Sequence, residues 1–248
     1  MSIVKSEKRS TRPIGFKINK DITITSTGIV NINVPFIVNH VDFFPSSFKL
    51  EIFEKVIYID PVIVDEDVPA DYILITHAHQ DHFSMKDIKK LLKKETIVIC
   101  PEQVYKKISK ELKGYKIVNT KPGDNMSFGN IAVESVSAYN LKSGLLVPHP
   151  KSHMNVGYII SSADIKIYHT GDTDYTSEMR KLKNIALVLA PIDGDNLTMN
   201  TEKAAEFVNH IEPRYVIPMH YNTPTDETEK LKKLVNENIE VVILEEKN

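Results

Sequence analysis

The sequence predicts an α/β protein with two sheets whose outer faces are covered by helices. Short apolar segments rich in Val and Ile alternate with charged segments in which Ile, Leu and Val recur at helical spacing. There are more apolar segments than a single doubly wound sheet would contain, and helical segments occur in both halves of the chain. Both observations favour two sheets. With 248 residues, of which 42% are hydrophobic, the chain is long enough to bury a core.

Strands are predicted where β-branched and aromatic residues gather between turn residues. They occupy residues 47–53, 56–60, 72–76, 96–100, 115–119, 131–138, 156–161, 165–170, 186–191, 215–219 and 240–244. Residues 1–38 are predicted to form a β-rich N-terminal extension, because a polar start gives way to the alternating segment DITITSTGIVNINV. The main domain is therefore expected to span residues 39–248.

Four amphipathic segments predict helices, and each begins with a residue that suits a helix start. Ser84 and Asn200 are expected to act as N-caps. Pro101 is expected in the first turn, where proline is favoured, and Asp226 is expected to form a capping box with Glu229. The helices are predicted at residues 84–94, 101–112, 200–211 and 226–238.

The composition argues against several classes of function. A net charge of −2 offers no broad basic face for a nucleic acid, and no apolar stretch approaches the roughly 18–20 residues that a membrane span needs. Cys100 is the only cysteine and lies within an apolar run, so it is expected in the core of a protein from a reducing compartment. We therefore expect a cytoplasmic protein that binds neither nucleic acid nor membrane.

Four side chains of the kind that bind metals follow the apolar segment at residues 72–76. In the sequence ILITHAHQDHFS, His77 and His79 are two residues apart, so at a strand end they can point toward one common position. Asp81 and His82 follow after the chain has begun to turn, and they can face a second position nearby. A solvated loop would not need this concentration of ligand-type residues, so the segment predicts part of a two-metal site.

Two later strand ends offer further ligands. Asp172 follows a glycine in IYHTGDTD, and His220 follows the apolar segment at residues 215–219. Alone, each would be read as an ordinary turn or surface residue. Together with the histidine-rich loop they complete a plausible ligand set, and a carboxylate can join two cations through its two oxygens. Asp172 is therefore predicted to bridge the metals.

The order of these motifs resembles the metallo-β-lactamase superfamily over about residues 39–248. Within it, the segments IYIDP, SAYNLKSGLLVPHPK, IYHTGDTDYTSEM and VIPMHYN are similar to a small metal-dependent hydrolase branch related to the ascorbate-phosphate lactonases. The resemblance implies a four-layer αββα sandwich whose active site lies where strand-end loops meet. It also implies that His77, His79 and a third histidine hold one metal, whereas Asp81, His82 and His220 hold the other.

The third histidine of the first metal has two candidates. His149, in the segment HPK, matches the branch better than His153 and is taken as the ligand. His153 is then expected to contact the substrate or to act as a general acid. Asn140 stands where relatives outside the branch often carry a histidine, so it is expected to line the site. His40 departs from the Gly-His turn of relatives and is either a residue at the edge of the site or a plain loop histidine.

The function implied is hydrolysis of a small ester, lactone or phosphoester. Two divalent ions, zinc or alternatively manganese or iron, would supply a bridging hydroxide, with Asp81 and Asp172 as the catalytic carboxylates. Lys142 and Lys151 lie near the third ligand and are candidates to hold an anionic group, although a solvated charged loop is the slightly preferred explanation.

The alternative is an iron-dependent oxidoreductase of the same fold. Its flavin-coupled di-iron members usually carry Glu at the second motif position, where this chain has His79, so hydrolysis is favoured. His169 and His210 are expected to have structural roles. The predicted partner is a small-molecule substrate, and the sequence makes no prediction of the oligomeric state.

Overall fold

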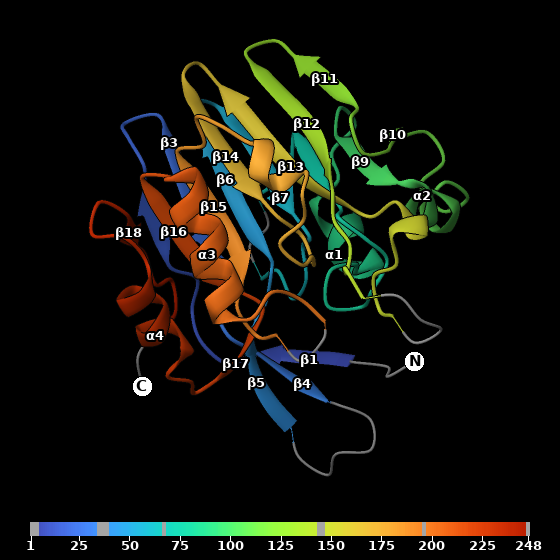
Figure 1. Ribbon diagram of the computed structural model, residues 1–248. Coiled ribbons are helices and arrows are strands. Elements are labelled where there is room, and N and C mark those ends of the chain that lie inside the picture. The colour runs from blue at the N-terminus through green and yellow to red at the C-terminus, as the bar shows by residue number, and fades with distance from the viewer. Residues whose placement is uncertain (1–4, 34–39, 66–67, 143–146, 195–196, 247–248) are drawn as a thin grey trace. The chain divides into compact units, whose positions relative to one another are not determined.

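The computed structural model describes residues 5–33, 40–65, 68–142, 147–194 and 197–246 (Figure 1). It divides into two compact units. Unit 1 comprises Met1–Asn119, Asn222–Pro224 and Leu244–Asn248, and unit 2 comprises Thr120–Tyr221 and Thr225–Ile243. Each unit is built around one seven-stranded sheet.

The large sheet of unit 1 combines antiparallel and parallel strands. Its first four strands along the chain pair antiparallel, and β7, β8 and β9 pair parallel. In the order β10-β9-β8-β7-β6-β3-β2, its strands are β10 (Lys116–Thr120), β9 (Ile97–Pro101), β8 (Tyr72–Leu74), β7 (Lys55–Ile59), β6 (Phe48–Ile52), β3 (Ile22–Ser26) and β2 (Gly15–Lys17).

Two helices, α1 (Met85–Leu91) and α2 (Glu102–Ile108), pack on one face of this sheet. Their apolar stripes contribute Ile88 and Val104 to a core that also contains Ile73 and Val98 of the central strands. Cys100 belongs to the same core, as the sequence predicts, and burial raises the pKa of its thiol to about 12. This thiol therefore stays protonated at neutral pH and is unreactive.

The large sheet of unit 2 follows the same plan. Its β11–β14 part is antiparallel, and the strands from β14 onward are parallel. In the order β11-β12-β13-β14-β15-β16-β18, its strands are β11 (Asn125–Phe128), β12 (Ile131–Ser137), β13 (Val156–Ser162), β14 (Ile165–His169), β15 (Leu187–Pro191), β16 (Tyr215–Met219) and β18 (Glu240–Val241).

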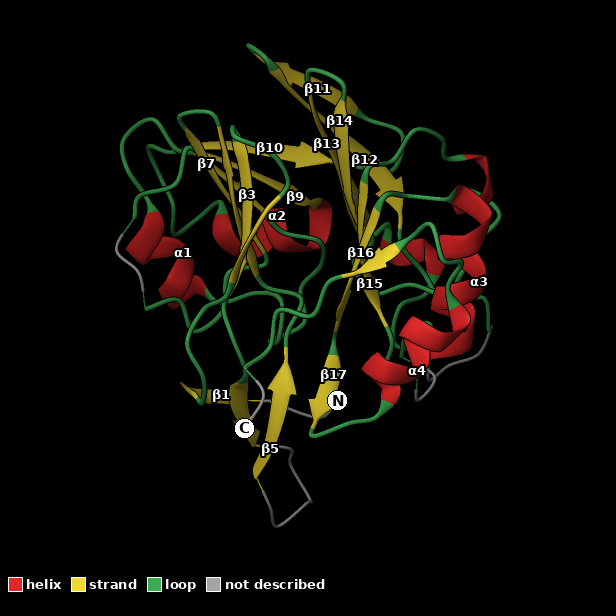
Figure 2. Ribbon diagram, turned by 90° about the vertical axis from the view of Figure 1, so that its left-hand side faces the viewer, coloured by secondary structure: helices red, strands yellow, loops and turns green. Residues whose placement is uncertain are grey.

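The helices of unit 2 are α3 (Thr201–Ile211) and α4 (Glu227–Leu234), with short 3₁₀ segments at Lys151–His153 and Met179–Lys181. Both helices lie on one side of the sheet (Figure 2). Phe207 of α3 meets the ring of Tyr168 of β14 edge-on, with ring centroids 6.2 Å apart. The two units therefore each consist of a sheet with helices against it, and the predicted α/β class is confirmed.

A third, four-stranded sheet has the order β1-β4-β5-β17. Its strands are β1 (Lys5–Arg9), β4 (Val30–Asn33), β5 (His40–Phe44) and β17 (Tyr221–Thr223). The N-terminal strands therefore belong to two different sheets. β3 pairs with β6 in the large sheet of unit 1, whereas β4 pairs with β5 in the four-stranded sheet. The predicted boundary at residue 38 falls outside the described residues and stays a prediction.

Two of the four predicted helix starts are observed as predicted, and two differ. Ser84 accepts a hydrogen bond from the Asp87 amide at 3.3 Å, and Asn200 accepts one from the Lys203 amide at 2.9 Å. Pro101 occupies the N-cap position of α2, one residue before the first turn in which it was predicted. Asp226 is also an N-cap residue, but its side chain makes no capping bond because its backbone is helical, with φ −92° and ψ −3°.

Every predicted strand from residue 47 onward has a counterpart, but several strands were not predicted. β2 is too short to give a pattern, and β11 alternates exposed with half-buried residues without a strongly apolar face. β5, β17 and β1 also lacked a clear apolar period. Within the described residues, no helix is long and apolar enough to span a membrane.

Candidate metal centre

In unit 1, a buried carboxylate lies beside the histidine-rich loop. Asp60 follows β7 and Thr76 follows β8, and because these strands are parallel neighbours their carboxyl ends lie at one edge of the sheet. The Asp60 carboxylate is fully buried and accepts hydrogen bonds from the Thr76 amide at 2.7 Å and the Thr76 hydroxyl at 2.6 Å. Its third partner is Nδ1 of His82, at 2.7 Å.

These hydrogen bonds fix which ring nitrogens can bind a metal. A carboxylate accepts, so Nδ1 of His82 carries the proton and Nε2 keeps its lone pair. The Thr76 hydroxyl donates to Asp60 and can only accept from Nδ1 of His77, 3.0 Å away. His77 therefore also presents Nε2. One carboxylate orients both imidazoles, directly for His82 and through Thr76 for His77.

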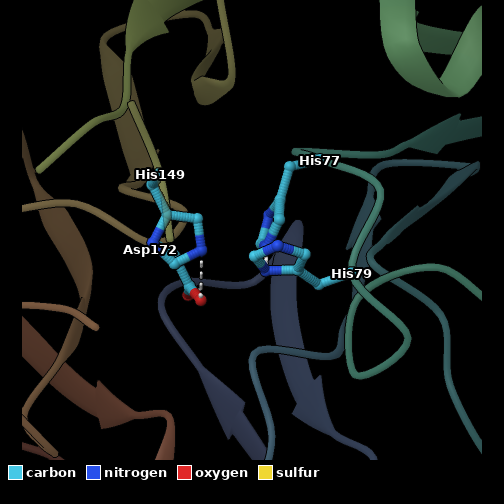
Figure 3. Close-up of side chains that lie close together, drawn as sticks. All are labelled: His77, His79, His149 and Asp172. Atoms are coloured by element: carbon cyan, nitrogen blue, oxygen red, sulfur yellow. Dashed lines mark hydrogen bonds and ion pairs between the residues drawn. The ribbon is translucent and has the colours of Figure 1, made fainter. Parts of the chain in front are cut away.

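The side-chain nitrogen and oxygen atoms of the histidine-rich loop in unit 1 are spaced like the ligands of a transition-metal ion. Nε2 of His77 lies 3.0 Å from Nδ1 of His79, and this pair is drawn in Figure 3. Nε2 of His82 lies 3.6 Å from Oδ2 of Asp81. Bonds of about 2.0–2.1 Å in tetrahedral geometry place neighbouring ligand atoms roughly 3.3–3.4 Å apart, so both spacings suit coordination.

In unit 2, one carboxylate oxygen lies close to two histidines. The chain leaves β14, turns at Gly171 with φ +64°, and presents Asp172, which is only 2% exposed. Oδ2 of Asp172 lies 3.4 Å from Nε2 of His149 (Figure 3) and 3.2 Å from Nε2 of His220. Both distances suit neighbouring ligands of a metal ion.

A second set of hydrogen bonds orients His149 within unit 2. Its Nδ1 lies 3.0 Å from the carbonyl oxygen of Leu197 and 3.2 Å from Oδ1 of Asn140. Both partners are oxygen acceptors in this arrangement, since the Asn140 amide nitrogen donates to the same Leu197 carbonyl at 2.9 Å. Nδ1 of His149 therefore carries the proton, and Nε2 faces Asp172 as a potential ligand.

Comparison with known proteins identifies the family. The family described as "Beta-lactamase superfamily domain" matches residues 43–220. The chain belongs to the metallo-β-lactamase superfamily. The UPF0173 metal-dependent hydrolase of Archaeoglobus fulgidus is 31% identical over 224 residues, which cover 80% of this chain and 92% of that protein. The UPF0173 metal-dependent hydrolase of Thermococcus onnurineus is 34% identical over 210 residues, which cover 77% and 89%.

A solved structure supports the same assignment. A crystal structure of a protein from Parabacteroides distasonis matches with a TM-score of 0.75 and 28% identity, over 95% of this chain and 99% of that one. The predicted metallo-β-lactamase fold class is therefore confirmed. The closer link to the ascorbate-phosphate lactonases stays a prediction.

The predicted metal ligands have side chains that could bind an ion, and their role as ligands stays a prediction. The candidate metal-binding groups among the described residues consist of His77, His79, Asp81, His82, His149, Asp172 and His220. His153 is not among them; it is exposed and ends the 3₁₀ segment Lys151–His153. Residues 143–146, within the segment SAYNLKSGLLVPHPK, lie outside the described residues.

Three further predicted residues have well-defined surroundings. Asn140 is buried and, as described above, contacts His149. The Lys151 ammonium forms an ion pair of 2.8 Å with Glu178, donates to the Tyr139 hydroxyl, and holds the pKa of the Glu178 carboxyl at about 2. The described contacts of Lys151 are thus structural. The side chain of His40 lies outside the described residues.

The remaining histidines have the structural surroundings expected of them. His169 is buried, and its Nδ1 accepts from the Gly171 amide at 3.2 Å within the turn that presents Asp172. His210, near the end of α3, lies with Nε2 3.0 Å from the carbonyl oxygen of Arg180.

Asp60 and Thr76 contact the candidate ligands but were not predicted from the sequence. Aspartate and threonine are common after apolar strands, so neither residue type stands out. The one indication was that Asp60 ends the segment VIYID, one strand before the histidine-rich loop. Asp60 and His220 also adopt left-handed backbone conformations, with φ +47° and φ +54°. Such conformations in residues other than glycine concentrate at functional sites.

Proposed function

We propose that this chain is a metal-dependent hydrolase that cleaves a small ester, lactone or phosphoester with two divalent metal ions. His77, His79 and His149 would hold the first ion, and Asp81, His82 and His220 the second, with Asp172 shared by both. When bound, such ions lower the pKa of water to around 7 and polarise the scissile oxygen of the substrate. Family membership and the relatives' names support the coarser statement that it is a metal-dependent hydrolase.

The observation that carries the two-ion proposal is the environment of Asp172. A single oxygen lies at ligand-to-ligand distance from His149 on one side and from His220 on the other. A single ion could also take all three of these atoms. We propose two ions because His149 and His220 belong to different candidate ligand groups, whereas Asp172 belongs to both.

The donor set suits zinc, with manganese or iron as alternatives. Neutral imidazole nitrogens and carboxylate oxygens are ligands that all three ions accept. The hydrogen bonds of Asp60, Thr76 and Asn140 hold His77, His82 and His149 in the tautomer that presents Nε2. The imidazoles therefore lose little conformational freedom on coordination.

The chain's own residues would divide the remaining work. Asp81 is half-buried beside His82, so its carboxylate would accept a hydrogen bond from the attacking water and orient it. Asp172 would hold the two imidazoles at a fixed separation. These roles need no serine or cysteine nucleophile. Cys100, the single cysteine of the sequence, is buried in the core of unit 1.

The test of this proposal is turnover without oxygen. Protein loaded with zinc or manganese should hydrolyse at least one substrate in a screen of lactones, thioesters, carboxylate esters and phosphodiesters under strictly anaerobic conditions and without reductant. A hydrolase uses only water as its second substrate, so removing oxygen should leave the rate unchanged. Activity that appears only with iron, oxygen and a reductant would instead establish the oxidoreductase alternative.

A further inference from the structure

Three side chains of unit 2 form a closed cluster beside the segment that carries His149. The Tyr139 hydroxyl donates to Glu178 at 2.9 Å and accepts from the Lys151 ammonium at 3.2 Å. The ammonium also pairs with Glu178 at 2.8 Å and lies 4.4 Å from the centroid of the Tyr139 ring. Each of the three side chains therefore contacts the other two, and we call them the Tyr139 cluster.

The cluster joins three segments that are far apart along the chain. Tyr139 follows β12, Lys151 begins the 3₁₀ segment just after His149, and Glu178 lies between β14 and β15. Because these segments belong to no common helix or strand, their positions relative to one another depend on side-chain and loop contacts such as these.

The main chain of Tyr139 is bonded to the turn that presents Asp172. Its amide donates to the Thr173 hydroxyl at 3.1 Å, and its carbonyl oxygen accepts from the Asp174 amide at 3.0 Å. Thr173 is fully buried and Tyr139 is 8% exposed, so water has little access to these bonds. The position of Tyr139 is therefore tied to that of Asp172.

The side chain of Lys151 ties the same cluster to His149. The amide of Asn140 donates to the His149 carbonyl at 2.8 Å, and its Oδ1 accepts from the His149 amide at 3.0 Å. Two residues further on, the Lys151 ammonium holds the chain against the Tyr139 hydroxyl. The cluster thus connects the two segments between which Nε2 of His149 and Oδ2 of Asp172 lie 3.4 Å apart (Figure 3).

We propose that the Tyr139 cluster positions His149 relative to Asp172 for the first metal ion. Lys151 and Glu178 are then positioning residues, which raise the metal affinity of that site without binding the ion or the substrate. The inference rests on the proposed function, because it takes His149 and Asp172 as ligands of that ion. Ligands that are held at coordination distance before the ion arrives lose less conformational freedom when they bind it.

The ion pair acts through the tyrosine that both of its members contact. On its own the pair is partly exposed, with 62% of the Lys151 side chain and 34% of the Glu178 side chain accessible, and such pairs contribute little. Tyr139, in contrast, is buried, and its hydroxyl accepts from one member and donates to the other. The three contacts therefore form a small network that fixes both segments together.

Zinc affinity tests the cluster by a route that does not depend on turnover. Metal-free protein is titrated with zinc in competition with a chromophoric chelator, and the first site is identified as the one whose affinity falls in His149→Ala. In Lys151→Met and in Glu178→Met, the affinity of this site should fall about tenfold, while the affinity of the second site stays unchanged. The double variant should bind no more weakly than either single variant, because both substitutions break the same contact.

Two further variants separate positioning from a general effect on stability. Lys151→Arg keeps a charge that can reach Glu178, so it should retain the zinc affinity of the wild type. The matched control is Lys203→Met/Glu206→Met, which removes an ion pair of 2.6 Å and similar exposure from α3 of the same unit. This control should leave both zinc affinities unchanged. A purely structural role for the cluster would instead lower the thermal stability of the Lys151 and Glu178 variants and leave the affinity of the first site as it was.

Unchanged affinity of the first site in both single variants would overturn the proposal, and so would equal losses at the two sites. Neither result would affect hydrolysis by the wild-type protein, so the proposed function would stand. Zinc binding that depends on the cluster, in a protein that hydrolyses nothing in the screen, would support the cluster and contradict the proposed function. A wild-type chain that binds no zinc would overturn both.

Discussion

Replacing Asp172 with alanine should reduce hydrolysis to background and strip the purified protein of metal. The carboxylate is the one group proposed to serve both ions, and its Oδ2 lies next to His149 and His220 alike. A ligand contributes about 3 kcal/mol to the affinity of a four-ligand structural site, which is roughly a hundredfold. Because both ions would lose this ligand at once, the loss should exceed that of any other single ligand.

The fold should survive this substitution, because the hydrogen bonds of the turn before Asp172 come from His169 and Gly171. Far-ultraviolet circular dichroism and thermal unfolding check this, and metal content is measured by mass spectrometry. Asp164→Ala is the matched control, because Asp164 is an exposed aspartate in the turn after β13 of the same sheet. Full activity in Asp172→Ala would remove this residue from the centre.

The variant His149→Ala should lose one metal ion per chain, whereas His153→Ala should keep its full metal content. His149 is 1% exposed, and its proton is held on Nδ1 by Asn140 and Leu197, so Nε2 is available to an ion. His153 is exposed and belongs to no candidate metal group among the described residues. The affinity of the first site should fall roughly a hundredfold in His149→Ala.

Kinetics of the same pair of variants assign a role to His153. A general acid contributes about 10²–10⁴-fold to the rate, so a fall of this size in kcat with unchanged metal content would make His153 the acid. An unchanged rate would leave it a surface residue. Two ions retained in His149→Ala and one in His153→Ala would show that the ligand is the other histidine.

The sequence predicted the parts of the centre that are local. His77, His79, Asp81 and His82 share one loop, and their spacing at a strand end is enough to predict convergence. The strands and helices around them follow from apolar periodicity and from helix caps. Ser84, for example, caps its helix through the amide of Asp87, only three residues along the chain. Asp172 and His220 were predicted only because the loop had already suggested a metal, and the family resemblance supplied their order.

The orienting groups could not be predicted, because their contacts depend on pairing between distant segments. Asp60 reaches His82 only because β7 and β8 are parallel neighbours in register. Asn140 was expected to line the site, but its described contacts are with His149 and the Leu197 carbonyl, a segment far along the chain. The polar strand β11 and the two-residue β18 likewise depend on their partners more than on their own sequence.

The metal content of the wild-type protein tests the central proposal most directly. The protein is purified without added metal, stripped with a chelator, and titrated with zinc, and the bound ions are counted against chain concentration by mass spectrometry. Seven ligands, with Asp172 shared, predict two ions per chain at saturation. A reproducible limit of one ion per chain, in protein that is folded and active, would contradict the two-metal centre.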